Sequence, residues 1–162
     1  MGLSLVLKAE LTGVTNLEPI DEAGNPYIYS FEIQCTSCRE KHDKYVEVTA
    51  WETHEISGSR GEANFVWKCK MCRREGSASF VRQKPNSYDE EDSGKWKPIV
   101  EFEVRGLEFT AFKVEGPWRC KSAVNNTVFD ELDLQEDEWF DYDEKASTEV
   151  SITEIAWDLK RS

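Results

Sequence analysis

The stretch Leu3-Ser4-Leu5-Val6-Leu7-Lys8-Ala9-Glu10-Leu11 alternates along its length and is followed closely by Gly13. A period of two places successive side chains on opposite faces of an extended chain, so the stretch predicts a β-strand with one buried face. Strand patterns recur in several further places, at residues 27–33, 45–51, 63–67, 78–81, 98–107 and 150–159. Because almost no helical periodicity accompanies them, the chain is expected to be all-β.

Two cysteine pairs, Cys35 with Cys38 and Cys69 with Cys72, follow predicted strands. A two-residue spacer lets both thiolates of a tight turn reach one ion at about 2.3 Å. The 30 residues between the pairs exceed the spacer of small zinc modules, so each pair is expected on its own hairpin. Four thiolates complete a tetrahedral site and leave no open position for a catalytic water. The pattern predicts one structural Zn²⁺ with these four cysteines as ligands.

Other uses of the cysteines are alternatives to this prediction. A CxxC pair can act as a redox dithiol, although that role usually goes with a single pair at a helix N-terminus. Thiolates also bind other soft ions, so metal transfer to a partner is a second alternative. Cys120, which follows Arg119, faintly resembles the nucleophile of the B-type methionine sulfoxide reductases. That enzyme would need histidines near its nucleophile.

The two histidines, His42 and His54, lie far upstream of Cys120 and are expected to be surface or packing residues. Carboxylates are so abundant that pairs of them arise by chance and indicate no acid–base catalysis. Gly58-Ser59-Arg60-Gly61 lacks the spacing of a phosphate-binding loop and instead predicts a hairpin turn, from which Arg60 could bind an acidic group. We therefore expect no catalytic residues and no enzyme.

The net charge is −12 over 162 residues. Nucleic-acid binding requires a basic face that neutralises phosphates, so a nucleic-acid partner is not expected. The one basic cluster, Lys68, Lys70, Arg73 and Arg74, is expected to offset the charge of the thiolates. No apolar run is long enough to span a bilayer, and Lys8 interrupts the first one too early for a secretory signal. A monomeric cytoplasmic or nucleocytoplasmic protein without a membrane partner is expected.

Residues 136–144 are dense in both acidic and aromatic side chains and include Trp139. Because aromatic residues anchor many protein interfaces, the stretch is a candidate docking surface for a protein partner. The alternative is a solvated loop with one or two aromatic rings packed into the core. The sequence does not identify the partner.

Residues 98–107 align with residues 5–14 at a constant offset of 93, which places Gly106 on Gly13. The alignment predicts a weak internal duplication, although any amphipathic strand that ends at glycine resembles another. The polar stretch 84–94 separates the two copies. The expected organisation is a zinc-bearing half, 1–97, and a half without metal ligands, 98–162, packed as one globular unit.

Several stretches in the same order resemble the eukaryotic CXXC-motif-containing zinc-binding proteins over essentially the full length. The matching segments are 7–11, 15–17, 35–38, 58–61 running to 68–72, 100–103, 105–108 and 134–146. The resemblance implies a duplicated all-β protein whose two antiparallel sheets pack as an elongated sandwich. It also implies one zinc ion at one end, held by Cys35, Cys38, Cys69 and Cys72. It implies no catalytic residue and gives Cys120 no role.

Overall fold

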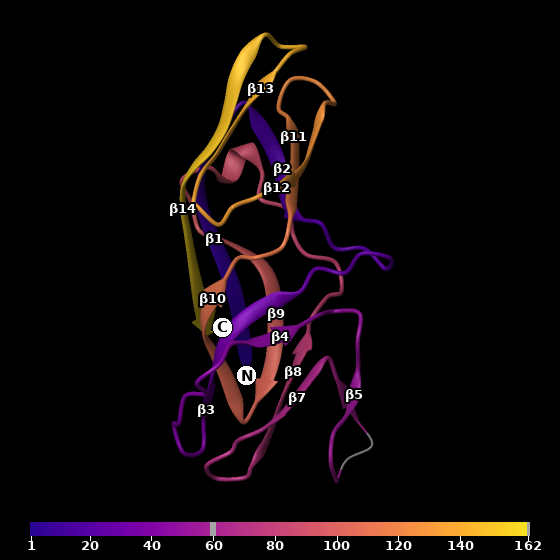
Figure 1. Cartoon of the computed structure of the whole chain (residues 1–162), viewed down its shortest axis with the longest axis vertical. Coiled ribbons are helices and arrows are strands. Elements are labelled where there is room, and N and C mark those ends of the chain that lie inside the picture. The colour runs from indigo at the N-terminus through magenta and orange to yellow at the C-terminus, as the bar shows by residue number, and fades with distance from the viewer. Residues whose placement is uncertain (59–60, 162) are drawn as a thin grey trace.

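The structure, a computed structural model, describes residues 1–58 and 61–161, and the predicted turn residues Ser59 and Arg60 lie outside this range. The described chain is elongated and built from antiparallel strands, with one short 3₁₀ turn, η1 (Glu90–Asp92) (Figure 1). The prediction of an all-β antiparallel protein is confirmed. Across the described residues we find no helix with the length and apolar composition that a membrane crossing requires.

A six-stranded sheet forms one layer, with the strand order β13-β14-β1-β9-β8-β7. The strands are β1 (Gly2–Thr12), β7 (Phe65–Lys68), β8 (Glu75–Phe80), β9 (Lys97–Arg105), β13 (Trp139–Asp143) and β14 (Thr148–Arg161). β1 lies between β14 and β9, and its residues from Leu3 to Leu7 are all buried, including those on the face that was expected to meet solvent. The predicted single buried face is therefore wrong for this part of the strand. A central strand loses its solvent-facing side where other segments cover it.

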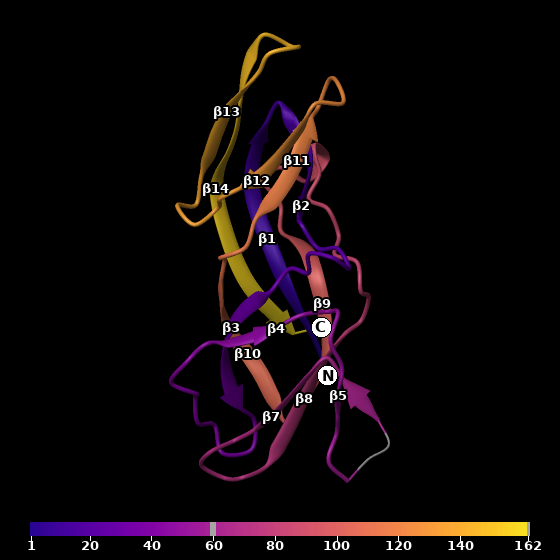
Figure 2. The same ribbon diagram turned by 45° about the vertical axis from the view of Figure 1, so that its right-hand side comes forward.

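The second layer consists of two three-stranded sheets rather than one continuous sheet. The lower sheet has the order β10-β3-β4 and the upper has the order β12-β11-β2, as Figure 2 shows from the side. The strands are β2 (Val14–Pro19), β3 (Tyr29–Cys35), β4 (Val46–Val48), β10 (Leu107–Lys113), β11 (Trp118–Ser122) and β12 (Val128–Leu132). A separate hairpin of β5 (His54–Glu55) and β6 (Glu62–Ala63) lies beside β7 and β8.

Aromatic rings join the two layers. The ring of Phe31 on β3 stacks on Phe109 of β10 at 4.3 Å and meets the edge of Phe102 on β9 at 5.6 Å. Higher in the molecule, the fully buried Trp118 on β11 packs at 5.3 Å from Trp157 on β14 and donates an Nε1–H hydrogen bond to the Tyr27 hydroxyl at 3.1 Å. One continuous core therefore runs the length of the molecule and holds its lower end in place.

The glycines that defined the predicted repeat occupy equivalent turns. Gly13 connects β1 to β2 and Gly106 connects β9 to β10, with φ angles of +74° and +73°. A left-handed backbone of this kind favours glycine because other residues carry a Cβ that clashes there. The internal duplication and the division at residues 97 and 98 stay predictions. Strands from both expected halves pair within the six-stranded sheet, where β1 lies next to β9 and β14.

A buried carboxylate ties the two upper hairpins together. Asp143, at the end of β13, accepts hydrogen bonds from the Asn125 side chain at 3.1 Å and from the Ala146 N–H at 3.2 Å. Its pKa lies below the ordinary value because the Ser122 hydroxyl and these donors stabilise the ionised form.

Acid is expected to weaken this link between the hairpins. The pKa of this carboxyl is lower in the folded chain than in the unfolded chain, where it is about 3.9, so the carboxyl stabilises the fold at pH values above about 3.9. This stabilisation is lost as the pH falls through the pKa of the folded chain. Asp143→Asn should therefore unfold at a lower temperature than the unchanged protein near neutral pH, and the difference should shrink below about pH 4. Thermal unfolding from pH 7 to pH 2 measures it. A difference that does not change with pH would contradict the assignment.

Candidate metal centre

Two turns of the same geometry carry the cysteine pairs at the lower end of the molecule (Figure 1). In the first, which follows β3, the Arg39 N–H donates to the Cys35 carbonyl at 3.0 Å and the Cys35 N–H donates to the Glu40 carbonyl at 2.9 Å. In the second, between β7 and β8, Arg73 and Cys69 form the corresponding bonds at 3.0 and 2.9 Å. Arg39 and Arg73 take φ angles of +67° and +66°. Each turn thus presents two sulfurs on a closed loop of backbone.

The two turns bring all four sulfurs together, and every pair of Sγ atoms lies within 4.8 Å. Cys35 Sγ lies 3.6 Å from Cys72 Sγ, and Cys38 Sγ lies 3.6 Å from Cys69 Sγ. Sulfurs at 2.3 Å from a tetrahedral Zn²⁺ are about 3.8 Å apart, whereas disulfide sulfurs are about 2.0 Å apart. The arrangement fits one tetrahedral ion. In both of these close approaches one sulfur belongs to the first turn and the other to the second, so an ion bound by them would link the two turns.

Backbone N–H groups directed at the sulfurs favour thiolates. Burial opposes ionisation of Cys35, but the N–H groups of Cys38 and Ser37 donate to its sulfur and lower its pKa to about 6. The N–H groups of Cys72 and Met71 likewise lower the pKa of Cys69. Thiolates of this kind are the form that binds metal.

A negative charge on Cys38 is harder to form. The Glu40 N–H donates to Cys38 Sγ, yet partial desolvation and the neighbouring sulfurs raise the pKa of Cys38 to about 12. A divalent cation at the centre of the cluster removes this obstacle, since it stabilises all four thiolates at once. The donor set therefore fits a soft divalent ion such as zinc.

The remaining residues singled out in the sequence lie outside this cluster. Cys120 sits on β11 in the upper sheet, where burial and the charges of Asp141 and Asp130 raise its pKa to about 12. His42 packs against the Trp67 ring at 6.1 Å, and His54 Nε2 lies 3.8 Å from Glu52. The structure thus places neither histidine among the metal-ligating atoms of the cluster.

The acidic-aromatic stretch folds as an edge strand, β13, rather than as a loop. Trp139 packs against Phe129 of β12 at 5.4 Å, whereas Phe140 and Tyr142 point outward and are 63% and 48% exposed. The exposed aromatic residues of this surface are therefore Phe140 and Tyr142. Alternation along a strand is the signal that separates them from Trp139.

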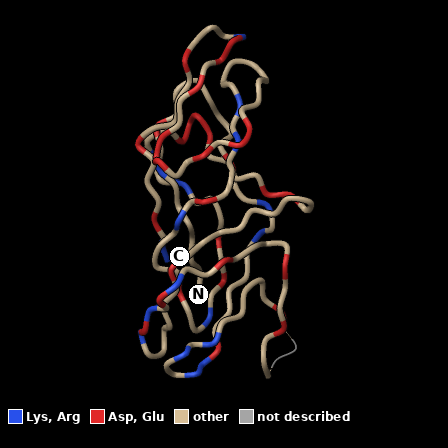
Figure 3. The backbone as a smooth tube through the Cα atoms, viewed as in Figure 1, with Lys and Arg blue, Asp and Glu red and all other residues tan. Residues whose placement is uncertain are grey.

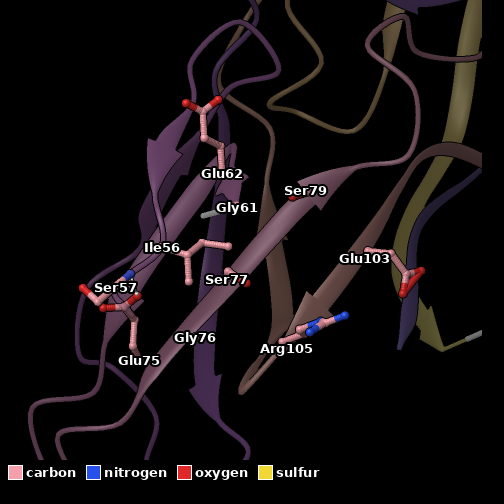
Figure 4. A pocket seen from close by; sticks show the side chains of 10 residues that line it. All are labelled: Ile56, Ser57, Gly61, Glu62, Glu75, Gly76, Ser77, Ser79, Glu103 and Arg105. Atoms are coloured by element: carbon pink, nitrogen blue, oxygen red, sulfur yellow. Dashed lines mark hydrogen bonds between the residues drawn. The ribbon is translucent and has the colours of Figure 1, made fainter. Parts of the chain in front are cut away.

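A cavity of about 630 Å³ opens between the β5–β6 hairpin and the outer face of β8 and β9 (Figure 4). Two of its three carboxylates already accept hydrogen bonds. Glu75 accepts one from the Ser57 N–H at 2.9 Å, and Glu103 accepts one from the N-terminal ammonium at 3.1 Å. Its described lining brings together no cysteine or histidine. Nothing in this lining identifies a ligand.

A smaller cleft of about 240 Å³ lies between the two cysteine turns and was not predicted from the sequence. The segment from Glu40 to Asp43 forms one wall, and Trp67 with the segment from Cys69 to Met71 forms the other. Nothing in either segment alone indicates the cleft, because it exists only where the two turns meet.

Comparison with known proteins gives consistent matches over nearly the whole chain. The sequence model of a eukaryotic family described as CXXC motif containing zinc binding protein matches residues 4–160. UPF0587 protein C2D10.03c from Schizosaccharomyces pombe is 48% identical over 160 residues, which cover 98% of each protein. The human CXXC motif containing zinc binding protein is 37% identical over 153 residues, or 94% of each.

Two solved structures share the fold. The crystal structure of C1orf123 superposes with a TM-score of 0.92 at 34% sequence identity and covers 100% of both chains. A hypothetical protein from Plasmodium falciparum superposes with a TM-score of 0.86 at 25% identity and covers 99% of both.

Proposed function

The chain belongs to the eukaryotic family of CXXC motif containing zinc binding proteins, and on this basis we propose that one structural Zn²⁺ clasps its two cysteine turns in a protein-interaction module. Cys35, Cys38, Cys69 and Cys72 would hold the ion. The observation that carries the proposal is the approach of the four sulfurs, two from each turn, to within 4.8 Å of one another. Bound there, the ion would supply charge neutralisation and a cross-link.

The proposed role is structural because four thiolates fill the coordination sphere of zinc. A hydrolytic zinc needs an open position for water, and this ligand set provides none. Catalysis by Cys120 is also disfavoured, because its thiol is buried and its pKa is raised to about 12, whereas a nucleophilic cysteine needs an accessible thiolate. We therefore propose a binding protein and not an enzyme.

The proposed interaction surface is the outer side of β13, which displays Phe140 and Tyr142 among acidic residues. Exposed aromatic side chains contribute much of the binding energy in protein interfaces. We propose a monomeric adaptor in the cytoplasm, with protein partners and without nucleic-acid or membrane partners.

Metal analysis of the purified protein is expected to find one zinc ion per chain and none in Cys35→Ser. The reason is that three sulfurs no longer close the tetrahedron. Zinc retained in Cys35→Ser at the original stoichiometry would contradict the assignment.

Affinity capture from cell extract tests the surface on β13. The double variant Phe140→Ser/Tyr142→Ser should lose captured proteins that Val81→Ser keeps, since Val81 is equally exposed but lies elsewhere. An unchanged set of captured proteins would remove support for this surface.

A metal-handling or thiol-redox role is the second candidate, because the cluster has an accessible side. Cys35 and Cys69 are buried, but Cys38 is exposed and Cys72 is half-buried. An oxidant or an acceptor protein can reach exposed sulfur more easily. Rapid release of zinc under a mild oxidant, with the fold retained, would favour this role over that of a permanently bound structural zinc.

A further inference from the structure

The two ends of the molecule carry opposite charge, as Figure 3 shows. The segments 35–45 and 68–75, which form the zinc end, contain seven basic and three acidic residues. Residues 130–154, which form the opposite end, contain eleven acidic residues and one basic residue. Even with two further negative charges from a Zn²⁺–tetrathiolate centre, the zinc end stays positive.

Most of the cations at the zinc end have no carboxylate partner. Lys41 lies 3.5 Å from Glu32. Within the described residues, the other six have no ion pair within 4.0 Å; they are Arg39, Lys44, Lys68, Lys70, Arg73 and Arg74. The Debye length is about 8 Å at physiological ionic strength, so the acidic end is screened from this region. These six charges are available to a partner.

The cleft between the two cysteine turns gives this basic end an apolar recess. The rings of His42 and Trp67 meet edge to face at 6.1 Å, and Met71, which is 68% exposed, stands at the rim. Its volume of about 240 Å³ suits one large apolar side chain. Aromatic rings and a flexible thioether can adapt to such a side chain.

We propose that this cleft binds an extended acidic segment of a partner protein, with one aromatic or large aliphatic side chain inserted between Trp67 and Met71. Aspartate and glutamate side chains of the segment pair with Lys70 in the lining of the cleft and with the other unpaired cations of the two cysteine turns. This inference rests on the proposed function, because it assigns a second surface and a class of partner to the same interaction module.

The two walls of the cleft favour a peptide over a nucleic acid. Glu40 and Asp43 on the first wall can accept hydrogen bonds from the N–H groups of an extended peptide. Such a peptide can direct its N–H groups at these carboxylates and its acidic side chains at the cations. A phosphodiester backbone has no such donor and is charged at every unit, so both carboxylates would repel it. The two acidic residues therefore favour a ligand that carries hydrogen-bond donors, such as a peptide, over a nucleic acid.

The test uses a fluorescein-labelled peptide of glutamates around a central phenylalanine, titrated with the zinc-loaded full chain and followed by fluorescence anisotropy. Lys70→Glu should weaken binding about tenfold or more, whereas Lys145→Glu, the same charge change at the acidic end, should leave it unchanged. Met71→Asp should abolish the preference for the phenylalanine peptide over one with a central serine. Raising the salt from low to high concentration should weaken binding throughout.

Metal content measured on each variant separates the two proposals. A protein that keeps one zinc per chain but binds no acidic peptide would overturn this inference and leave the proposal of a structural zinc site standing. Equal effects of Lys70→Glu and Lys145→Glu, or tighter binding of a labelled single-stranded oligonucleotide than of the peptide, would also overturn it. A purified chain without zinc would overturn the proposed function instead.

Discussion

Replacement of Cys69 by serine is expected to abolish zinc binding and to disorder the lower end of the molecule while the central sheet persists. Structural zinc sites with cysteine ligands bind with apparent free energies on the order of 10 kcal/mol in peptides. In this protein the ion would join the turn that follows β3 to the turn between β7 and β8. The large core above them includes Phe31, Phe102 and Phe109 and contains none of the four cysteines.

Amide hydrogen exchange measures this effect residue by residue. The N–H groups of Arg39 and Arg73, which are hydrogen-bonded within the cysteine turns, should lose protection in Cys69→Ser. Amides in β1 and β9 should keep it. Cys120→Ser is the matched control, because it removes a buried thiol outside the cluster and should leave zinc and the turns unchanged. Uniform loss of protection along the chain would show instead that the zinc is needed for the whole fold.

Replacement of Trp118 by alanine is expected to cost about 3–5 kcal/mol of unfolding free energy. Its side chain is fully buried and connects β11 with Tyr27 and with Trp157 on β14. Alanine removes the ring contacts, leaves a cavity and deprives the buried Tyr27 hydroxyl of its donor.

Urea unfolding measures the loss, and Trp96→Ala provides a control of the same chemistry. Trp96 is 40% exposed and lies beneath the ammonium groups of Lys160 and Lys8, so its removal should cost much less. Trp118→Ala should still bind one zinc, because the metal cluster lies at the other end. Similar costs for the two substitutions would contradict the role given to Trp118.

The strands with clean alternation could be predicted from the sequence even where they carry charges, as β9 does, whereas two other strands could not. The strand predicted from Leu3 to Leu11 lies within β1, and the strand predicted from Tyr27 to Ile33 overlaps β3. β11 and β13 were not predicted as strands, because Trp118 to Ser122 is short and Trp139 to Asp143 carries two aspartates. Strand propensity depends on pairing and burial, and both strands form only because β2, β12 and β14 lie beside them.

The metal cluster could be predicted because its ligands follow a local rule. The spacing within each pair reflects the geometry of a single turn, and two such turns suggest one ion. The cleft beside it could not be predicted, since His42 and Trp67 are distant in sequence and meet only after β3 and β7 have taken their places. The distinction between the half-buried Trp139 and the exposed Phe140 likewise needed the strand and its neighbours.

The position of β1 has a consequence for how a nascent chain acquires this fold. β1 is made long before β14, yet the two strands pair, and Leu3 lies opposite Arg161. Contacts between residues so far apart in sequence form slowly, because a long loop must close before they stabilise anything. We expect β1 to stay without one of its two partner strands until β14 has been made. During that interval a chaperone that shields extended apolar segments would compete directly with aggregation.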